Sequence, residues 1–242
     1  MPLKEWYKRI YGRPSMFNTY VTCPHKYKHA PKFTSEQQKL WTYAHSLLQD
    51  FKTDRVSYEH SYAKCFLNDF IPKEQKLLNE WLNLVIEDEP TLIDEFEWIL
   101  EIEMWNYLFV IPYHIDNVLA SWLSDYKTSK ALWNTDIEYN YQRICYSLWY
   151  YFHKNEFDRQ MPMPFKFVIL TKHARGARKQ IVSWDNEWNE FIAGVEFDKL
   201  IDLLKRIVIS ERKDNYPSYT NMFCKNCPLY QKCPSFTSLP VY

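Results

Sequence analysis

At its centre the chain carries the stretch His114-Ile115-Asp116-Asn117-Val118-Leu119-Ala120-Ser121-Trp122-Leu123-Ser124-Asp125-Tyr126-Lys127-Thr128. It is predicted to form two short strands joined by a tight turn. Side chains alternate between the two faces of a strand, so Asp125 and Lys127 point the same way and Tyr126 points the other. If the hairpin pairs Asp116 near Asp125, two carboxylates and one ammonium group meet at one place.

The expected meeting of Asp116, Asp125 and Lys127 suits one kind of chemistry. Two close carboxylates repel one another unless a cation lies between them. Oxygen ligands of this kind suit Mg²⁺ or Mn²⁺, and a nearby lysine can orient or deprotonate a water, or stabilise developing negative charge. The set predicts metal-assisted hydrolysis of a phosphodiester. The alternative interpretation is a surface hairpin with an ordinary Lys–Asp pair.

The composition indicates a chain of 242 residues that forms one domain, or one domain with an added lobe. The 30 Lys and Arg residues balance the 30 Asp and Glu residues, so any polyanionic partner must be held by local basic groups. The N-terminus has no apolar signal core, and no apolar run approaches the length of a membrane span. We therefore expect a soluble, cytoplasmic protein that does not bind a membrane.

Three of the six cysteines are crowded near the C-terminus, at Cys224, Cys227 and Cys233. Without a secretion signal, disulfides are disfavoured. Thiolates at this spacing usually hold a metal ion or an iron–sulfur cluster. Cys145 is expected to be a packed thiol instead, because it lies inside an aromatic helix.

Periodicity predicts an alternation of helices and strands. Apolar residues at helical spacing predict helices over residues 35–51, 58–87, 135–153 and 196–212. Strands are predicted over 96–104, over 106–111 until Pro112 interrupts them, and over 165–171 and 180–184. The order favours an α/β fold with a mixed sheet flanked by helices.

Further candidates lie on these elements. His45 borders the apolar stripe of the first helix, and a partly buried structural histidine is its alternative interpretation. Gln142 and Tyr146 share a helix face, which could equally be a packing face. The basic hairpin tip at 172–179 could contact phosphates or be an ordinary solvated turn.

Six motifs occur in one order along residues 15–233. They are Ser15 through Tyr20 to Cys23-Pro24 and Tyr27; Ala44-His45; Ile115-Asp116; Asp125-Tyr126-Lys127-Thr128; Gln142 with Tyr146; and the Cys224, Cys227, Cys233 tail. Together they resemble the PD-(D/E)XK nuclease superfamily, specifically its RecB-type iron–sulfur branch. That branch includes the CRISPR-associated four-cysteine nucleases and the nuclease domain of AddB-type helicase–nucleases.

The resemblance implies a fold and a domain plan. The fold would be a restriction-endonuclease-like α/β core, with a mixed central sheet flanked by helices. A single domain would span residues 1–242, with the nuclease core at about 35–212. A cysteine-rich segment at 213–242 would be tied to the N-terminal region through Cys23.

The resemblance also implies a role for each matching residue. The divalent ion, Mg²⁺ or Mn²⁺, would be held by His45, Asp116, Asp125 and the backbone carbonyl of Tyr126. Lys127 would be the catalytic lysine, and Gln142 and Tyr146 would position the DNA strand or the active-site hairpin. A 4Fe-4S cluster, with zinc as the second candidate, would be held by Cys23, Cys224, Cys227 and Cys233.

The implied activity is a metal-dependent DNA nuclease, an exonuclease acting on DNA ends or single strands. One departure concerns the glycine that usually precedes the first aspartate, since Tyr113 or His114 stands there. His114 could add a ligand, and Glu101 or Glu103 could assist the metal. The departure motivates an alternative, a non-catalytic DNA-binding or scaffold subunit of a recombination or CRISPR adaptation complex. A zinc protein without nuclease activity is a further alternative.

Overall fold

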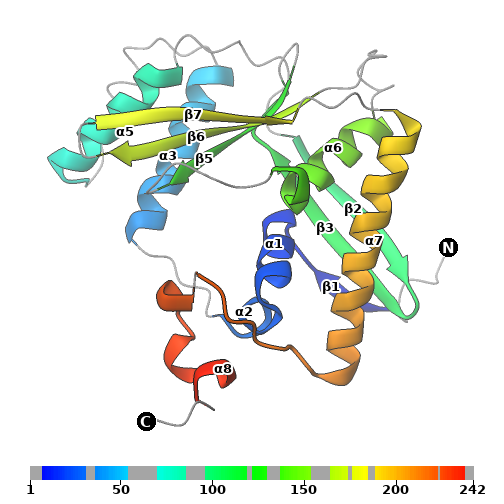
Figure 1. The fold of residues 1–242 in the computed structure, drawn as a ribbon. Coiled ribbons are helices and arrows are strands. Elements are labelled where there is room, and N and C mark those ends of the chain that lie inside the picture. Colours follow the sequence, from blue (N-terminus) through cyan, green and yellow to red (C-terminus); the bar gives the residue numbers. More distant parts are fainter. Residues whose placement is uncertain are drawn as a thin grey trace.

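The computed structural model describes residues 7–30, 36–53, 70–85, 96–118, 122–129, 137–153, 164–173, 176–184, 189–222 and 224–237 (Figure 1). The strands are β1 (Lys8–Tyr11), β2 (Phe96–Met104), β3 (Tyr107–Ile115), β4 (Asn117–Val118), β5 (Leu123–Ser129), β6 (Phe165–His173) and β7 (Gly176–Trp184). The α-helices are α1 (Pro14–Thr22), α2 (Pro24–His29), α3 (Glu36–Thr53), α5 (Pro72–Val85), α6 (Tyr141–His153), α7 (Glu190–Lys213) and α8 (Pro234–Thr237). Short 3₁₀ turns are η2 (Ile137–Tyr139), η4 (Cys224–Asn226) and η5 (Tyr230–Lys232).

The strands form two sheets, and the predicted α/β class is confirmed. One sheet has the order β1-β3-β2, with β1 parallel and β2 antiparallel to β3. The other has the order β4-β5-β6-β7, in which only β5 and β6 are parallel. The strands expected in one central sheet are thus divided, and the division falls at Asp116, between the end of β3 and the start of β4.

Two apolar cores cover the opposite faces of the second sheet. The larger core joins β1, β3, α1, α6 and α7 to the face of β6 that carries Phe165 and Phe167. The smaller core packs α3 and α5 against Tyr126, Val168 and Leu170 on the other face. This alternation along β5 and β6 buries both faces of the sheet, so polar side chains within it need partners from the protein.

The predicted hairpin is confirmed, with β4 antiparallel to β5 and Asn117 opposite Ser124. The expectation that Pro112 interrupts the preceding strand is wrong, because β3 continues to Ile115 and Pro112 lies opposite Ile99. The pairing of β1 with β3 ends at Val110. Beyond that point β3 has a described neighbour on one side only, and a proline is tolerated at such an open edge.

Helix ends differ from the periodicity where capping residues decide them. The helix expected from residue 135 begins at Tyr141, because the Asn140 side chain accepts hydrogen bonds from the Gln142 and Arg143 N–H groups. The helix expected from residue 196 begins at Glu190, where the Asn189 side chain caps the Ile192 N–H. The helix predicted over 58–87 is α5, and residues 58–69, 86 and 87 of that prediction lie outside the described residues.

Candidate active site

The site begins with Asp116 and Asp125, which lie near one another at the start of the β4–β5 hairpin. The β4–β5 pairing ends with Asn117 opposite Ser124, and Asp116, just before β4, accepts a hydrogen bond from the Tyr126 N–H, next to Asp125 in the chain. Lys127 lies on the same face as Asp125, and its ammonium group contacts the Asp125 Oδ2 atom. Tyr126 points the other way, into the smaller core. The structure therefore brings the three residues together as the alternation of the strand predicts.

Asp116 is held by backbone and faces a helix. Its Oδ2 atom accepts a hydrogen bond from the Tyr126 N–H at 2.6 Å. The Nδ1 atom of His45, on α3, lies 3.7 Å from the same oxygen. Burial is the largest cause that lowers the pKa of His45, and the Lys127 ammonium lowers it further. A neutral imidazole at ordinary pH is the form that can donate a lone pair to a metal ion.

Asp125 is the most enclosed acidic group of the site, with 2% of its surface exposed. Burial raises the pKa of its carboxyl to about 6, the Asp116 charge raises it too, and the Lys127 ammonium opposes both. Its Oδ1 atom accepts a hydrogen bond from the Gln142 Nε2 at 3.1 Å. Asp125 therefore has one oxygen fixed by an amide and the other against a cationic side chain.

Gln142 and Tyr146 reach the site from the first turns of α6, and both are buried. Gln142 Nε2 lies 2.8 Å from the Tyr146 hydroxyl as well as donating to Asp125. Burial and the Asp125 charge raise the pKa of Tyr146 well above its usual range, so the phenol stays protonated. Gln142 and Tyr146 therefore do more than form a packing face, because the Gln142 amide hydrogen-bonds the buried Asp125 carboxylate.

The donors suit a divalent cation in kind. Two carboxylates and one imidazole are ligands that Mg²⁺ and Mn²⁺ accept. The two aspartates repel one another in this buried place, and Lys127 and His45 now stand where a cation would relieve that repulsion. Within the ranges that the structure describes, no three His, Cys, Asp or Glu side chains converge tightly enough to hold an ion as they lie. Binding an ion would therefore require Lys127 to leave Asp125.

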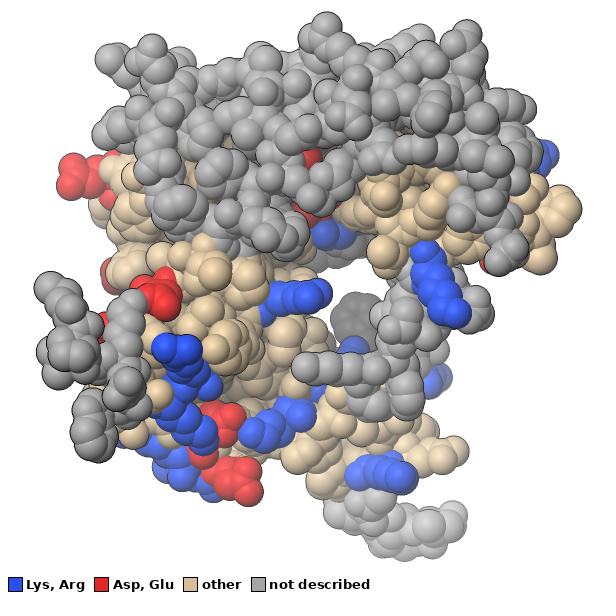
Figure 2. Space-filling view, turned by 180° about the vertical axis from the view of Figure 1, so that it is seen from behind, with Lys and Arg blue, Asp and Glu red and all other residues tan. Residues whose placement is uncertain are grey.

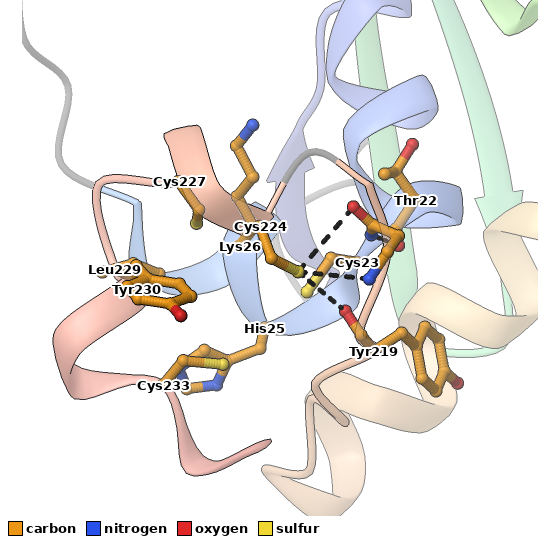
Figure 3. A pocket seen from close by; sticks show the side chains of 11 residues that line it. Thr22, Cys23, His25, Lys26, Tyr219, Cys224, Cys227, Leu229, Tyr230 and Cys233 are labelled. Atoms are coloured by element: carbon orange, nitrogen blue, oxygen red, sulfur yellow. Dashed lines mark hydrogen bonds between the residues drawn. The ribbon is translucent and has the colours of Figure 1, made fainter. Parts of the chain in front are cut away.

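The four cysteines of the C-terminal and N-terminal motifs line one pocket (Figure 3). Cys23 comes from the junction of α1 and α2, whereas Cys224, Cys227 and Cys233 come from the η4 and η5 turns and their flanks. Cys23 and Cys233 are buried, and the other two are half-buried. None of the four forms a disulfide within the described part of the chain, and the Cys224 sulfur accepts a hydrogen bond from the Asn221 N–H at 3.2 Å. Four thiols around one hollow are a ligand set that suits either an iron–sulfur cluster or zinc.

The other residues considered as metal ligands or phosphate contacts either lie away from the site or fall outside the described residues. Glu101 and Glu103 are exposed on β2, and Glu101 lies about 16 Å along the strand from Phe96, the partner of Ile115. Neither glutamate is beside Asp116. His114 is on β3, but its side chain lies outside the described residues, as do Cys65 and the hairpin tip at 174–175.

Sequence reasoning missed two polar contacts that support α6. Asn18 on α1 hydrogen-bonds Asn140 at the start of α6. The fully buried Arg143 contacts the Glu196 Oε2 atom at 3.0 Å and lies over the Trp184 ring at 4.1 Å. An asparagine just before an aromatic helix was a signal for the first contact, as an N-cap. No local pattern pointed to the second.

Comparison with known proteins supports the fold of this chain. No family model and no curated protein matches the sequence. Among solved structures, a protein from Eubacterium rectale described as a "putative exonuclease" aligns with a TM-score of 0.53 and 13% identity, over 92% of this chain and 87% of that chain. A second structure, SSO0001, aligns over 94% of this chain and 86% of that chain, with 12% identity and a TM-score of 0.40 that carries no argument. At such identity the first likeness shows that the two proteins share an α/β fold.

No helix among the described residues is both long and apolar enough to cross a membrane.

Proposed function

We propose that this protein is a divalent-metal-dependent DNA nuclease of the PD-(D/E)XK type, with an exonuclease action on DNA ends or single strands. The observation that carries the proposal is the grouping of Asp116, Asp125 and Lys127 beside the β4–β5 hairpin, with Gln142 hydrogen-bonded to Asp125. The shared fold with a protein described as a "putative exonuclease" supports it.

The roles follow from what each side chain can do where it lies. His45, Asp116, Asp125 and the Tyr126 carbonyl would hold Mg²⁺ or Mn²⁺, which when bound lowers the pKa of a coordinated water and polarises a phosphate. Gln142 keeps the Oδ1 atom of Asp125 occupied, so its Oδ2 atom is the one available to a cation. Lys127, once released from that oxygen, is placed to stabilise negative charge on the phosphate or to take a proton from water.

Local basic groups would hold the DNA, since the chain has no net charge. Figure 2 shows Lys and Arg side chains across the lower half of one face, with Asp and Glu side chains among them on one side, where β1, α2 and the cysteine-bearing segment lie in Figure 1. Exposed basic residues of these elements and their flanks are Lys8, Arg9, Arg13, Lys28, Lys225 and Lys232. Such groups bind the phosphate backbone without reading bases, as a nuclease without sequence preference requires.

The cysteine pocket would hold a structural 4Fe-4S cluster through Cys23, Cys224, Cys227 and Cys233. The cluster would tie the α1–α2 junction to the C-terminal segment. Zinc is the competing occupant for the same thiols. Iron, sulfide and zinc analysis of anaerobically purified protein separates the two, because the cluster gives a brown protein with stoichiometric sulfide and zinc gives a colourless one.

The activity is tested on single-stranded and double-stranded DNA with Mg²⁺, with Mn²⁺ and with chelator. We expect DNA degradation that needs the metal, and a loss of about 10²- to 10³-fold on Lys127→Ala. Lys205→Ala is the matched control, because Lys205 is an exposed lysine on α7 that pairs with Asp202 at the surface.

Two outcomes would overturn the assignment. Degradation by Lys127→Ala at the wild-type rate would place the activity elsewhere or in a contaminant. DNA binding without cleavage by the wild-type protein would favour the non-catalytic scaffold alternative.

A further inference from the structure

We propose that Asn18 is a positioning residue of this active site, acting from α1 through Asn140 on Gln142. The inference rests on the proposed nuclease function. The Asn18 side chain hydrogen-bonds Asn140 and Tyr141, neither of which is assigned a role in the chemistry. It holds the beginning of the helix that delivers Gln142 to Asp125.

The first step is a two-way contact between Asn18 and the start of α6. The Asn18 Nδ2 group donates to the Asn140 Oδ1 atom at 3.0 Å. The Asn18 Oδ1 atom accepts a hydrogen bond from the Tyr141 N–H at 2.7 Å. Both ends of the amide are used, so a carboxylate could make the second contact but not the first.

The second step is the cap that Asn140 makes on α6. Its Oδ1 atom also accepts from the Gln142 N–H at 3.0 Å and from the Arg143 N–H at 3.3 Å. These backbone groups have no partner within the helix, so the cap fixes where the helix begins. The donor from Asn18 keeps the oxygen of Asn140, rather than its NH₂ group, turned toward the helix.

The third step is the reach of Gln142 into the site. Gln142 is the second residue of α6, so its backbone is fixed by the cap and its side chain by Asp125 and Tyr146. A displacement of the first turn moves this amide directly. Misplacement of a catalytic constellation by about 1 Å can cost about 10²-fold in rate.

Helix α1 also borders the cysteine pocket. The same helix that carries Asn18 ends at Thr22, immediately before Cys23 in the cysteine pocket. Thr22 donates to the Asn18 carbonyl at 2.8 Å. Asn18 thus connects the element that borders the cysteine pocket with the element that orders the active site.

The test is a double-mutant cycle on DNA cleavage with Asn18→Ala and Gln142→Ala. We expect Asn18→Ala to lower kcat roughly 10- to 100-fold with little change in KM. In the Gln142→Ala background the same substitution should change kcat less than about twofold, because its route to Asp125 is already cut. Asn106→Ala is the matched control, since the exposed Asn106 side chain accepts from Arg212 at 2.8 Å, away from these residues.

A second readout does not depend on cleavage. The side-chain NH₂ resonances of Gln142, assigned by their loss in Gln142→Ala, should shift or broaden in Asn18→Ala and stay in place in Asn106→Ala. Should Asn18→Ala fail to fold, Asn18→Asp keeps the acceptor for Tyr141 and puts a carboxylate oxygen in place of the donor to Asn140, with a shift of the same resonances expected.

The failures are distinguishable. Losses in kcat that multiply in the double variant, or Gln142 resonances unmoved by the Asn18 variants, overturn the positioning role even in an active nuclease. A wild-type protein that cleaves no DNA overturns the proposed function, while the resonances still decide whether Asn18 sets the position of Gln142.

Discussion

The active site and the cysteine pocket are built in opposite ways. Asp125 and Lys127 lie on β5 and Asp116 lies just before β4, so the pairing of these two neighbouring strands brings the three residues close together. The four cysteines come from the two ends of the chain and lie on short helices and 3₁₀ turns. A local hairpin forms with little loss of chain entropy, whereas joining the ends of a chain requires long-range contacts to be stable first.

The hydrogen bonds that hold the two regions also differ in kind. In the active site each carboxylate already contacts protein groups, Asp116 the Tyr126 N–H and Asp125 the side chains of Gln142 and Lys127. The pocket is instead assembled by backbone contacts around the thiols. The His25 N–H donates to the Pro217 carbonyl at 3.2 Å, and the Asn221 side chain donates to the Thr22 carbonyl at 3.2 Å. The geometry of the active site therefore depends on the buried core, whereas that of the cysteine pocket depends on how firmly the C-terminal segment packs against α1 and α2.

The largest expected effect tests the support behind the active site. Arg143→Ala should destabilise the protein by about 3 kcal/mol, because the buried Oε2 atom of Glu196 loses its guanidinium partner while Lys199 still pairs with the Oε1 atom. Urea unfolding measures the change. Lys205→Ala on the exposed surface of α7 is the control, and a loss below about 1 kcal/mol for Arg143→Ala would mean that the pair of Arg143 and Glu196 contributes little to stability.

A smaller effect is expected at the docking of the C-terminal segment. Tyr216 is buried, its ring stacks on Tyr27 at 6.5 Å, and the Lys28 ammonium lies 5.0 Å from its centre. Tyr216→Ala should cost about 2–3 kcal/mol and lower the iron or zinc content of the purified protein. The exposed Tyr11→Ala is the control. Full metal content in Tyr216→Ala would show that the thiols dock the segment without this tyrosine.

The smallest effect is a pH dependence confined to the active site. The pKa of Asp125 is about 6 in the folded protein, above its ordinary value of 3.8, so the folded state binds more protons between these values than the unfolded state. This contribution to stability is present below pH 3.8 and is lost as pH rises through 6. Because the pKa of His45 is lowered, its contribution to stability grows as pH rises, which is the opposite direction. His45 is present in wild type and in each of the variants compared below.

Asp125→Asn removes the Asp125 contribution, and loss of this charge lowers the pKa of His45 further, which changes the pH dependence in the same direction. In chelator, its unfolding free energy relative to wild type should therefore increase as pH rises from 4 to 6. Urea midpoints at several pH values measure this difference, with the exposed Asp202→Asn as the control. Parallel curves for Asp125→Asn and wild type would mean that the carboxyl titrates normally.

Much of this architecture could be predicted because it depends on local periodicity. Strand alternation placed Asp125 and Lys127 together and sent Tyr126 to the opposite core, as the structure confirms. Helical spacing found the buried stripe of α3, including Leu40, Ala44 and Leu47. The four cysteines were expected together only through a family resemblance, since spacing alone could not join Cys23 to the other end of the chain.

The features that escaped prediction depend on neighbours distant in sequence. Pro112 stays within β3 because β1 ends at Tyr11, which the sequence around the proline does not reveal. The buried pair of Arg143 and Glu196 resembles two ordinary surface charges on amphipathic helices until α6 and α7 pack together. The division of the strands into two sheets likewise depends on how far each pairing extends.

The central claim is that Asp116 and Asp125 form a site for a divalent cation. It is tested most directly by titrating the protein with Mn²⁺ and following the electron paramagnetic resonance signal of the free ion. The account predicts that wild-type protein removes Mn²⁺ from solution, that Asp116→Asn and Asp125→Asn lose this binding, and that Asp202→Asn keeps it. Mn²⁺ binding that is unchanged in Asp116→Asn and Asp125→Asn would contradict the claim.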